Sequence, residues 1–159
     1  MDNEQLIKTL RATRGYYVQH VADLSEEQLL QEPPAAGHNI LWNIGHIIYT
    51  NCSVVYGPCG LKSPIPDSYE SMFKGGTGPK DWTVKPSISE VMDMLKSTND
   101  TIINDFKAGK FAAYAKLQLV PGYALETAEN AFAFNLFHEG IHIGMVMSLR
   151  KQIGAKPVH

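Results

Sequence analysis

The chain has 159 residues, 44% of them hydrophobic, and its 14 Lys and Arg nearly balance its 16 Asp and Glu. A chain of this length can bury a full hydrophobic core, so we expect one domain over residues 1–159. The charges form no basic stripe, which argues against a nucleic-acid partner. The polar N-terminus lacks a secretory signal, and no uncharged apolar run reaches membrane length. The sequence therefore predicts a cytoplasmic protein with no membrane partner.

The first segment with helical periodicity runs from about residue 2 to residue 21, and Asp2 or Asn3 can cap its start. Its apolar residues recur at helical spacing and should face the core: Leu6, Ile7, Leu10, Tyr17 and Val21. A capping box of Ser25 and Gln28 then predicts one further turn, which the following pair of prolines stops.

The second helix should begin at Asn39, a good N-cap, and end before Gly57. It is apolar nearly all round, which predicts a central and buried position. The connection over residues 57–86 should be irregular, because glycine and proline recur along it. A connection this long is typical of a lid or a crossover. We expect it to pack over the helices and bound the site, since it carries three aromatic residues: Tyr69, Phe73 and Trp82.

The third helix should start at the N-cap Ser87 and run to about Phe106. Residues 107–125 are less regular and are compatible with a strand or a short helix. The fourth helix should run from Thr127 to Ile153. Four helices with little strand signal predict an all-α fold, a four-helix bundle with a long irregular connection between its second and third helices.

Two histidines of the fourth helix, His138 and His142, are four residues apart, so both imidazoles can reach one ion. They share a helical stripe with Ala131, Phe134, Asn135, Met145 and Leu149, which predicts that both face the core. His46 lies in the middle of the apolar second helix. If these two helices face each other, three imidazoles converge on one metal ion. The alternative is that each histidine is a lone, hydrogen-bonded core residue.

Two other metal motifs fit less well. The string from His138 to His142 matches the zinc-protease signature H-E-x-x-H, but no third ligand follows it except the terminal His159. Glu139-x-x-His142 matches half of a di-iron site, but the second helix has Asn43 where the other glutamate is needed. Glu139 is a weak candidate for an acid or base beside the metal, and a solvated or capping carboxylate is the alternative.

Asparagines stand three residues before two of the proposed ligands, Asn43 before His46 and Asn135 before His138. A metal-bound histidine usually donates its other ring nitrogen to an oxygen acceptor. We therefore expect at least one of the two amides to hydrogen-bond a ligand ring, a metal-bound water or the substrate. Otherwise each satisfies a backbone carbonyl or bridges two helices.

Two further features concern the surroundings of the site. Trp42 and Tyr49 share the helical face of His46 and are candidate pocket residues. Gly140 and Gly144 lie on the side of the fourth helix away from the ligands, where a neighbouring helix of the same chain can approach closely. His20 and His38, like the terminal His159, carry no signal for the site.

The chain resembles the DinB-like (DinB/YfiT-type) metalloprotein family, in detail its DinB-2 branch. The resemblance rests on Asn39-Ile-Leu-Trp-Asn-Ile-Gly-His46 and on Phe137-His-Glu-Gly-Ile-His-Ile-Gly144, followed by Arg150 and Gly154. It implies a four-helix bundle of DinB/YfiT-like topology, a divalent ion on three histidines, and frequently a homodimer. The family often has an Arg or similar polar residue after the last ligand and a Gln two positions further. Here Ile143 and Met145 stand instead, so a polar substrate contact on that face is not carried over.

Characterised relatives in this family use low-molecular-weight thiols, which implies a metal-dependent enzyme of the thiol S-transferase kind. The resemblance implies Zn, Ni, Fe or Mn as the ion, and a small-molecule substrate and a low-molecular-weight thiol as the partners. A metal-binding or sensing module without turnover is the alternative. A helical interaction module without metal would require the three histidines to lie apart.

Overall fold

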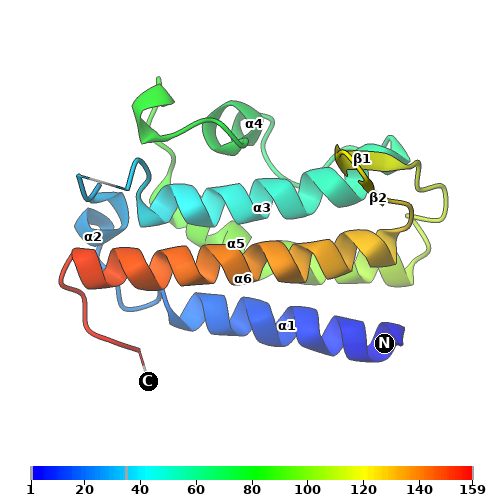
Figure 1. Ribbon diagram of the computed structural model, residues 1–159, viewed down its shortest axis with the longest axis horizontal. Helices are drawn as coiled ribbons and strands as arrows, with labels where there is room; N and C mark the ends of the chain where they lie inside the picture. The colour runs from blue at the N-terminus through cyan, green and yellow to red at the C-terminus, as the bar shows by residue number, and fades with distance from the viewer. Residues whose placement is uncertain (1, 35, 159) are drawn as a thin grey trace.

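The computed structural model describes residues 2–34 and 36–158, and most of them are helical (Figure 1). The elements follow in this order: α1 (Asn3–Gln19), α2 (Glu26–Leu30), α3 (Ile40–Tyr56), α4 (Ser68–Phe73), α5 (Ile88–Lys107), β1 (Leu117–Val120), β2 (Tyr123–Leu125) and α6 (Ala128–Gln152). Within the described ranges, no helix combines the length and the apolar character needed to cross a membrane.

The helix starts follow local capping chemistry. The side chain of Asp2 accepts a hydrogen bond from the Gln5 amide at 2.8 Å, and Asn39 and Thr127 cap α3 and α6 in the same way. The capping box predicted at Ser25 is present. A side-chain oxygen at the N-cap satisfies an amide that has no partner within the helix, so these boundaries are fixed by single residues. The predicted limits of the four long helices are confirmed to within a few residues.

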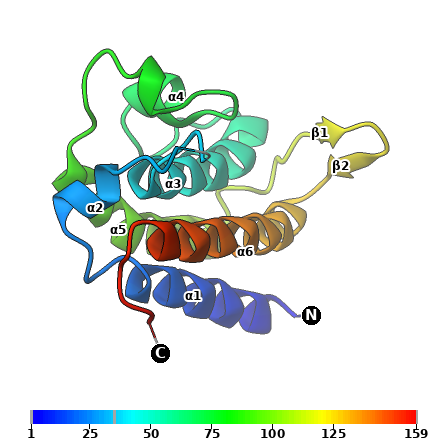
Figure 2. The same ribbon diagram turned by 60° about the vertical axis from the view of Figure 1, so that its left-hand side comes forward.

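The four long helices, α1, α3, α5 and α6, lie side by side (Figures 1 and 2). α3 packs against both α5 and α6, and α1 packs against the same two helices from the other side. As predicted, α3 is the central helix, and every residue from Ile40 to Ile48 is buried. The apolar positions predicted to face inward on α1 are buried too, so the helical periodicity identified the core face correctly.

The connection after α3 is more ordered than predicted. It contains the helix α4 and two short 3₁₀ turns, Gly57–Cys59 and Pro79–Asp81. Tyr69 and Phe73, four residues apart on α4, are both buried against the bundle. α4 has no side-chain cap and only six residues, so tertiary packing rather than local sequence stabilises it. The expectation that this segment packs over the helices is confirmed.

Within residues 107–125, for which the sequence left strand and short helix open, residues 117–125 form an antiparallel hairpin of β1 and β2. The turn between the strands contains Pro121 and Gly122, and Gly122 has φ of 83°, a conformation that favours glycine. The segment before the hairpin is tied to α3, because the Tyr114 hydroxyl donates to the backbone carbonyl of Val54 at 2.6 Å.

The outer face of α6 differs from the prediction. Gly140 and Gly144 are exposed, and a Cβ built on either would meet no atom of the described residues within 4 Å. No neighbouring helix of the chain approaches them, so assigning the pair to a contact within the bundle was wrong. Met145, which the stripe argument placed in the core, is 45% exposed. The four-residue spacing overestimated how much of α6 is covered, because α1 and α3 provide most of its contacts with the long helices and leave this side open.

Candidate metal centre

Three histidines from two helices meet in the interior of the bundle. His46 lies on α3, His138 and His142 lie on α6, and one ring nitrogen of each lies within 4.8 Å of the others. Nε2 of His46 is 3.2 Å from Nε2 of His138. Nitrogens around a tetrahedral ion with metal–nitrogen distances of about 2.0–2.1 Å lie roughly 3.3 Å apart. The predicted convergence is confirmed, and the interpretation as three lone core residues is wrong.

His46 is oriented by the last residue of α4. Its Nδ1 lies 2.7 Å from the backbone carbonyl of Phe73, which can only accept a hydrogen bond. Nδ1 therefore carries the ring proton, and Nε2 keeps its lone pair. Gly45 makes this contact possible, because a Cβ at that position would overlap the buried Phe73 ring. The long connection thus helps to build the site, as the sequence predicted.

His142 is oriented by an amide of the opposite helix. Its Nδ1 lies 2.8 Å from Oδ1 of Asn43. The amide of Asn43 cannot be turned round, since its Nδ2 donates to the backbone carbonyl of Asn39 at 2.8 Å. Asn43 is therefore the asparagine that hydrogen-bonds a ligand ring. Asn135 follows the alternative interpretation, because its Nδ2 donates to the backbone carbonyl of Asn51 at 3.4 Å and bridges two helices.

Fewer hydrogen bonds to oxygen acceptors orient the ring of His138 than orient the other two rings. Its Nδ1 is buried and has no hydrogen-bond partner among the described residues. The ring stacks on Phe134 with 5.6 Å between centroids and is half-buried, whereas His46 and His142 are buried. The orientation of this ligand therefore depends on packing and on the position of α6.

All three rings are neutral at physiological pH in the metal-free fold. Burial lowers the pKa of His46, and burial followed by repulsion from His46 lowers the pKa of His138 to about 4. Burial and then repulsion from the neighbouring histidines lowers the pKa of His142 to about 3. A neutral imidazole presents a lone pair to a cation without first losing a proton, so the site is ready for a metal ion.

An aromatic wall stands beside the histidines. Trp42 stacks on His46 with 4.7 Å between centroids, and His38 stacks on the same Trp42 side chain at 3.9 Å. The indole nitrogen donates to the Thr77 hydroxyl at 3.1 Å, which ties α3 to the connection. Trp42 thus lies at the site, and so does His38, which sequence reasoning left out. Tyr49 instead lines a pocket with residues of the segment 63–70.

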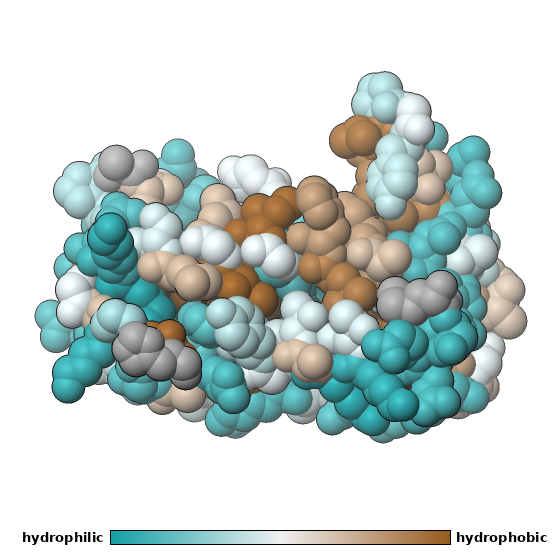
Figure 3. Space-filling model, turned by 60° about the horizontal axis from the view of Figure 1, so that its bottom comes forward, coloured by the Kyte–Doolittle hydropathy of each residue, from teal (hydrophilic) through white to brown (hydrophobic). Residues whose placement is uncertain are grey.

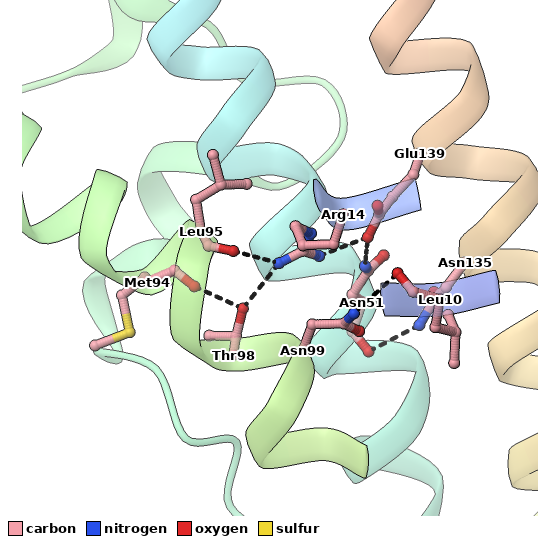
Figure 4. A network of polar contacts seen from close by, with 9 residues as sticks. All are labelled: Leu10, Arg14, Asn51, Met94, Leu95, Thr98, Asn99, Asn135 and Glu139. Atoms are coloured by element: carbon pink, nitrogen blue, oxygen red, sulfur yellow. Dashed lines mark hydrogen bonds and ion pairs between the residues drawn. The ribbon is translucent and has the colours of Figure 1, made fainter. Parts of the chain in front are cut away.

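Glu139 points away from the three rings and into the core. It is 1% exposed, so the interpretation as a solvated or capping carboxylate is wrong. Its Oε1 accepts hydrogen bonds from Arg14 of α1 and from Asn51 of α3, both at 2.5 Å (Figure 4). Sequence reasoning missed both partners. Arg14 lies one turn from Leu10 on the apolar stripe of α1, and a charge on such a stripe is the signal that could have revealed it.

The donor set suits a transition metal. Three imidazole nitrogens with no thiolate and no carboxylate among them are typical ligands of Zn, Fe and Ni sites. His20 does not lie at the site, since its Nδ1 bonds the Tyr16 carbonyl of the preceding helix, and His159 is outside the described residues.

Comparison with known proteins gives one family. The model of the DinB superfamily matches residues 9–146, a span that contains all three histidines. No curated protein matches the chain.

Proposed function

The chain belongs to the DinB superfamily, and from this premise we propose that it is a metal-dependent enzyme of the thiol S-transferase kind. In this proposal it is a four-helix bundle of DinB/YfiT-like topology that binds Zn, Ni, Fe or Mn at His46, His138 and His142. Its substrates are a low-molecular-weight thiol and an electrophile. We further propose that it is cytoplasmic and forms a homodimer.

One observation carries the proposal. The Nδ1 atoms of His46 and His142 face oxygen acceptors, so the Nε2 atom of each ring keeps a lone pair. The two rings converge with the ring of His138. Buried lone pairs that face one another repel unless a proton or a cation lies between them, and a divalent ion satisfies all three.

The surroundings of the histidines suit a thiol reaction. A divalent ion on three neutral imidazoles keeps its charge uncompensated and so favours the thiolate of a bound thiol. The stacked rings of Trp42 and His38 exclude water from one side. In the proposed reaction a sulfur–carbon bond forms between thiol and electrophile, the bond from that carbon to its leaving group breaks, and the thiol proton passes to the leaving group or to solvent.

The alternative is a metal-binding or sensing module without turnover. A structural site is closed, whereas a catalytic site keeps an open position beside a pocket. His138 is half-buried, and a cavity of about 170 Å³ is lined by Asn43, the hydrogen-bond partner of His142, and by His38. These two features favour the enzyme.

The test begins with protein stripped of metal and reloaded separately with zinc, nickel, iron(II) or manganese. Each form is assayed with a panel of small thiols and electrophiles, and metal binding is measured by equilibrium dialysis. His46→Gln should lose both metal and activity, while the control His20→Gln, another buried histidine, should keep both. Tight metal binding without turnover in any combination would favour the sensing module. A wild-type protein that binds none of these metals would refute the metal centre.

A further inference from the structure

Polar contacts cross the interface between α3 and α6 at three successive levels. Asn43 contacts His142 at 2.8 Å, His46 contacts His138 at 3.2 Å, and Asn51 contacts Glu139 at 2.5 Å. Along α3 these contacts come from residues 43, 46 and 51, and along α6 they come from residues 142, 138 and 139. On α3, His46 therefore lies between two residues, Asn43 and Asn51, whose side chains hydrogen-bond to α6.

The hydrogen bond of Asn51 to Glu139 is part of a cluster around the buried ion pair of Arg14 and Glu139, and this cluster involves all four long helices. Arg14 and Glu139 are 4% and 1% exposed. Arg14 of α1 donates to Glu139 of α6, and also to the Leu95 carbonyl and the Thr98 hydroxyl of α5 at 2.9 and 3.2 Å. Asn51 adds α3 to the cluster (Figure 4).

Stability alone does not explain such a cluster. Taking two charges out of water is costly, and well-packed apolar residues of similar size are often as stabilising or more so. A polar cluster and an apolar core differ in how strictly they fix the orientation of a helix. An apolar side chain packs acceptably at several rotations of its helix, whereas a carboxylate with two fixed donors has one position. A buried polar cluster is therefore suited to fixing the register between helices.

His138 is the ligand that most needs a fixed register. His46 and His142 each have an oxygen acceptor for Nδ1, but the buried Nδ1 of His138 has none among the described residues. A shift of one residue along an α-helix turns a side chain by about 100° and moves it about 1.5 Å. Metal–ligand distances tolerate only about 0.2 Å, so even a small rotation of α6 would move His138 out of reach.

We propose that Glu139 is a positioning residue of the three-histidine centre. Held by Asn51 and Arg14, it fixes the rotation and register of α6 against α3, and thereby keeps His138 within reach of the ion that His46 binds. This inference rests on the proposed metal centre, and it gives Glu139 a role other than acid or base.

The main test compares two buried amides. Asn51→Ala removes the link from α3 to Glu139, whereas Asn99→Ala removes a hydrogen bond to the Leu10 carbonyl that joins α5 to α1. Both variants should lose stability in urea. Only Asn51→Ala should bind Co²⁺ at least tenfold more weakly, with a changed visible absorption spectrum. Equal Co²⁺ affinity and equal spectra in the two variants would overturn the inference, while a wild-type protein that binds no Co²⁺ would refute the metal centre itself.

A second variant separates positioning from stability. The triple replacement Arg14→Met, Asn51→Leu and Glu139→Leu exchanges the cluster for apolar residues of similar size. We expect it to unfold at the same or a higher urea concentration than the wild type and yet to bind Co²⁺ at least tenfold more weakly. Wild-type affinity in a stable triple variant would overturn the inference. If the triple variant does not fold, the comparison of Asn51→Ala with Asn99→Ala decides.

Discussion

Asn43 and His142 face each other across the interface of α3 and α6, and the Asn43 amide oxygen lies 2.8 Å from His142 Nδ1. The second hydrogen bond of Asn43, to the Asn39 carbonyl, fixes which end of the amide faces the ring. The N-cap residue of α3 and a ligand of α6 are thus joined through one side chain. The tautomer of His142 is set by α3, so ligand chemistry and helix packing are coupled at this position.

The first prediction concerns the two asparagines. Replacing a hydrogen-bond partner of a ligand ring typically lowers metal affinity about 10–100-fold. Asn43→Leu should therefore weaken metal binding by about that factor. Asn135→Leu should cause a smaller loss, because Asn135 bonds a backbone carbonyl and not a ring. Competition titration with a coloured zinc chelator measures both affinities, and equal losses in the two variants would contradict this assignment.

The second prediction concerns Gly45. A Cβ there would overlap the Phe73 ring, which is buried and cannot easily move aside. Gly45→Ala should destabilise the protein by about 1–3 kcal/mol, the usual range for overpacking. It should also weaken metal binding, because the Phe73 carbonyl that orients His46 would be displaced.

Gly15 provides the control for this substitution. It lies on α1, and a Cβ built there meets no atom of the described residues within 4 Å. Gly15→Ala should therefore stabilise the protein by about 0.4–1 kcal/mol, since alanine lowers the entropy of the unfolded chain. Urea unfolding of both variants tests the pair, and a Gly45→Ala variant as stable as the wild type would show that Phe73 can move.

The sequence predicted those parts of the fold that depend on local chemistry. The caps at Asp2, Asn39 and Ser87 each accept a hydrogen bond from an amide three residues away, so these helix starts could be read from single residues. α4 and the hairpin of β1 and β2 were not predicted as such. Short elements of this kind are stabilised by contacts with residues far away in the chain, and their own sequence carries little signal.

The same division applies to the candidate site. The four-residue spacing of His138 and His142 and the central position of α3 were enough to predict the convergence with His46. The Phe73 carbonyl was not predictable, because a backbone oxygen has no sequence signature. The core position of Glu139 was missed because its partner Arg14 comes from α1, 125 residues earlier in the chain.

The third prediction concerns pH and the metal-free protein. Both His138 and His142 have folded-state pKa values, about 4 and about 3, below the ordinary 6.5 of an unfolded chain. Between these values and pH 6.5 the unfolded state binds more protons than the folded state. The free energy of unfolding should therefore be highest above pH 6.5. It should fall as the pH drops toward 4, by up to about 1.4 kcal/mol per pH unit for each ring.

Urea unfolding with a chelator present, repeated across this pH range, measures the effect. The wild type is compared with the double variant His138→Gln and His142→Gln, which keeps the carboxylates but lacks the two rings. The double variant should lose less stability on acidification. The same slope in both proteins would mean that the two rings titrate normally in the folded state.

The last prediction concerns the homodimer expected from the family resemblance. From Ala131 to Leu149, the one charged residue of α6 is the buried Glu139. The solvent-facing side of this stretch is therefore uncharged, and Figure 3 shows apolar side chains gathered in the middle of one face of the molecule, flanked by hydrophilic ones. The large exposed apolar residues on α6 are Phe137, Ile141, Met145 and Met147. Gly140 and Gly144 leave open space beside them.

We expect α6 of one copy to pack against α6 of another, because large side chains next to a glycine groove form a surface that complements itself about a two-fold axis. The wild type should then sediment as a dimer at micromolar concentration. Ile141→Glu places a charge in this surface and should give a monomer with unchanged helix content. Tyr123→Glu, at a residue of the hairpin with similar exposure, should remain a dimer. A wild type that sediments as a monomer would refute the homodimer, and a dimeric Ile141→Glu variant would place the contact elsewhere.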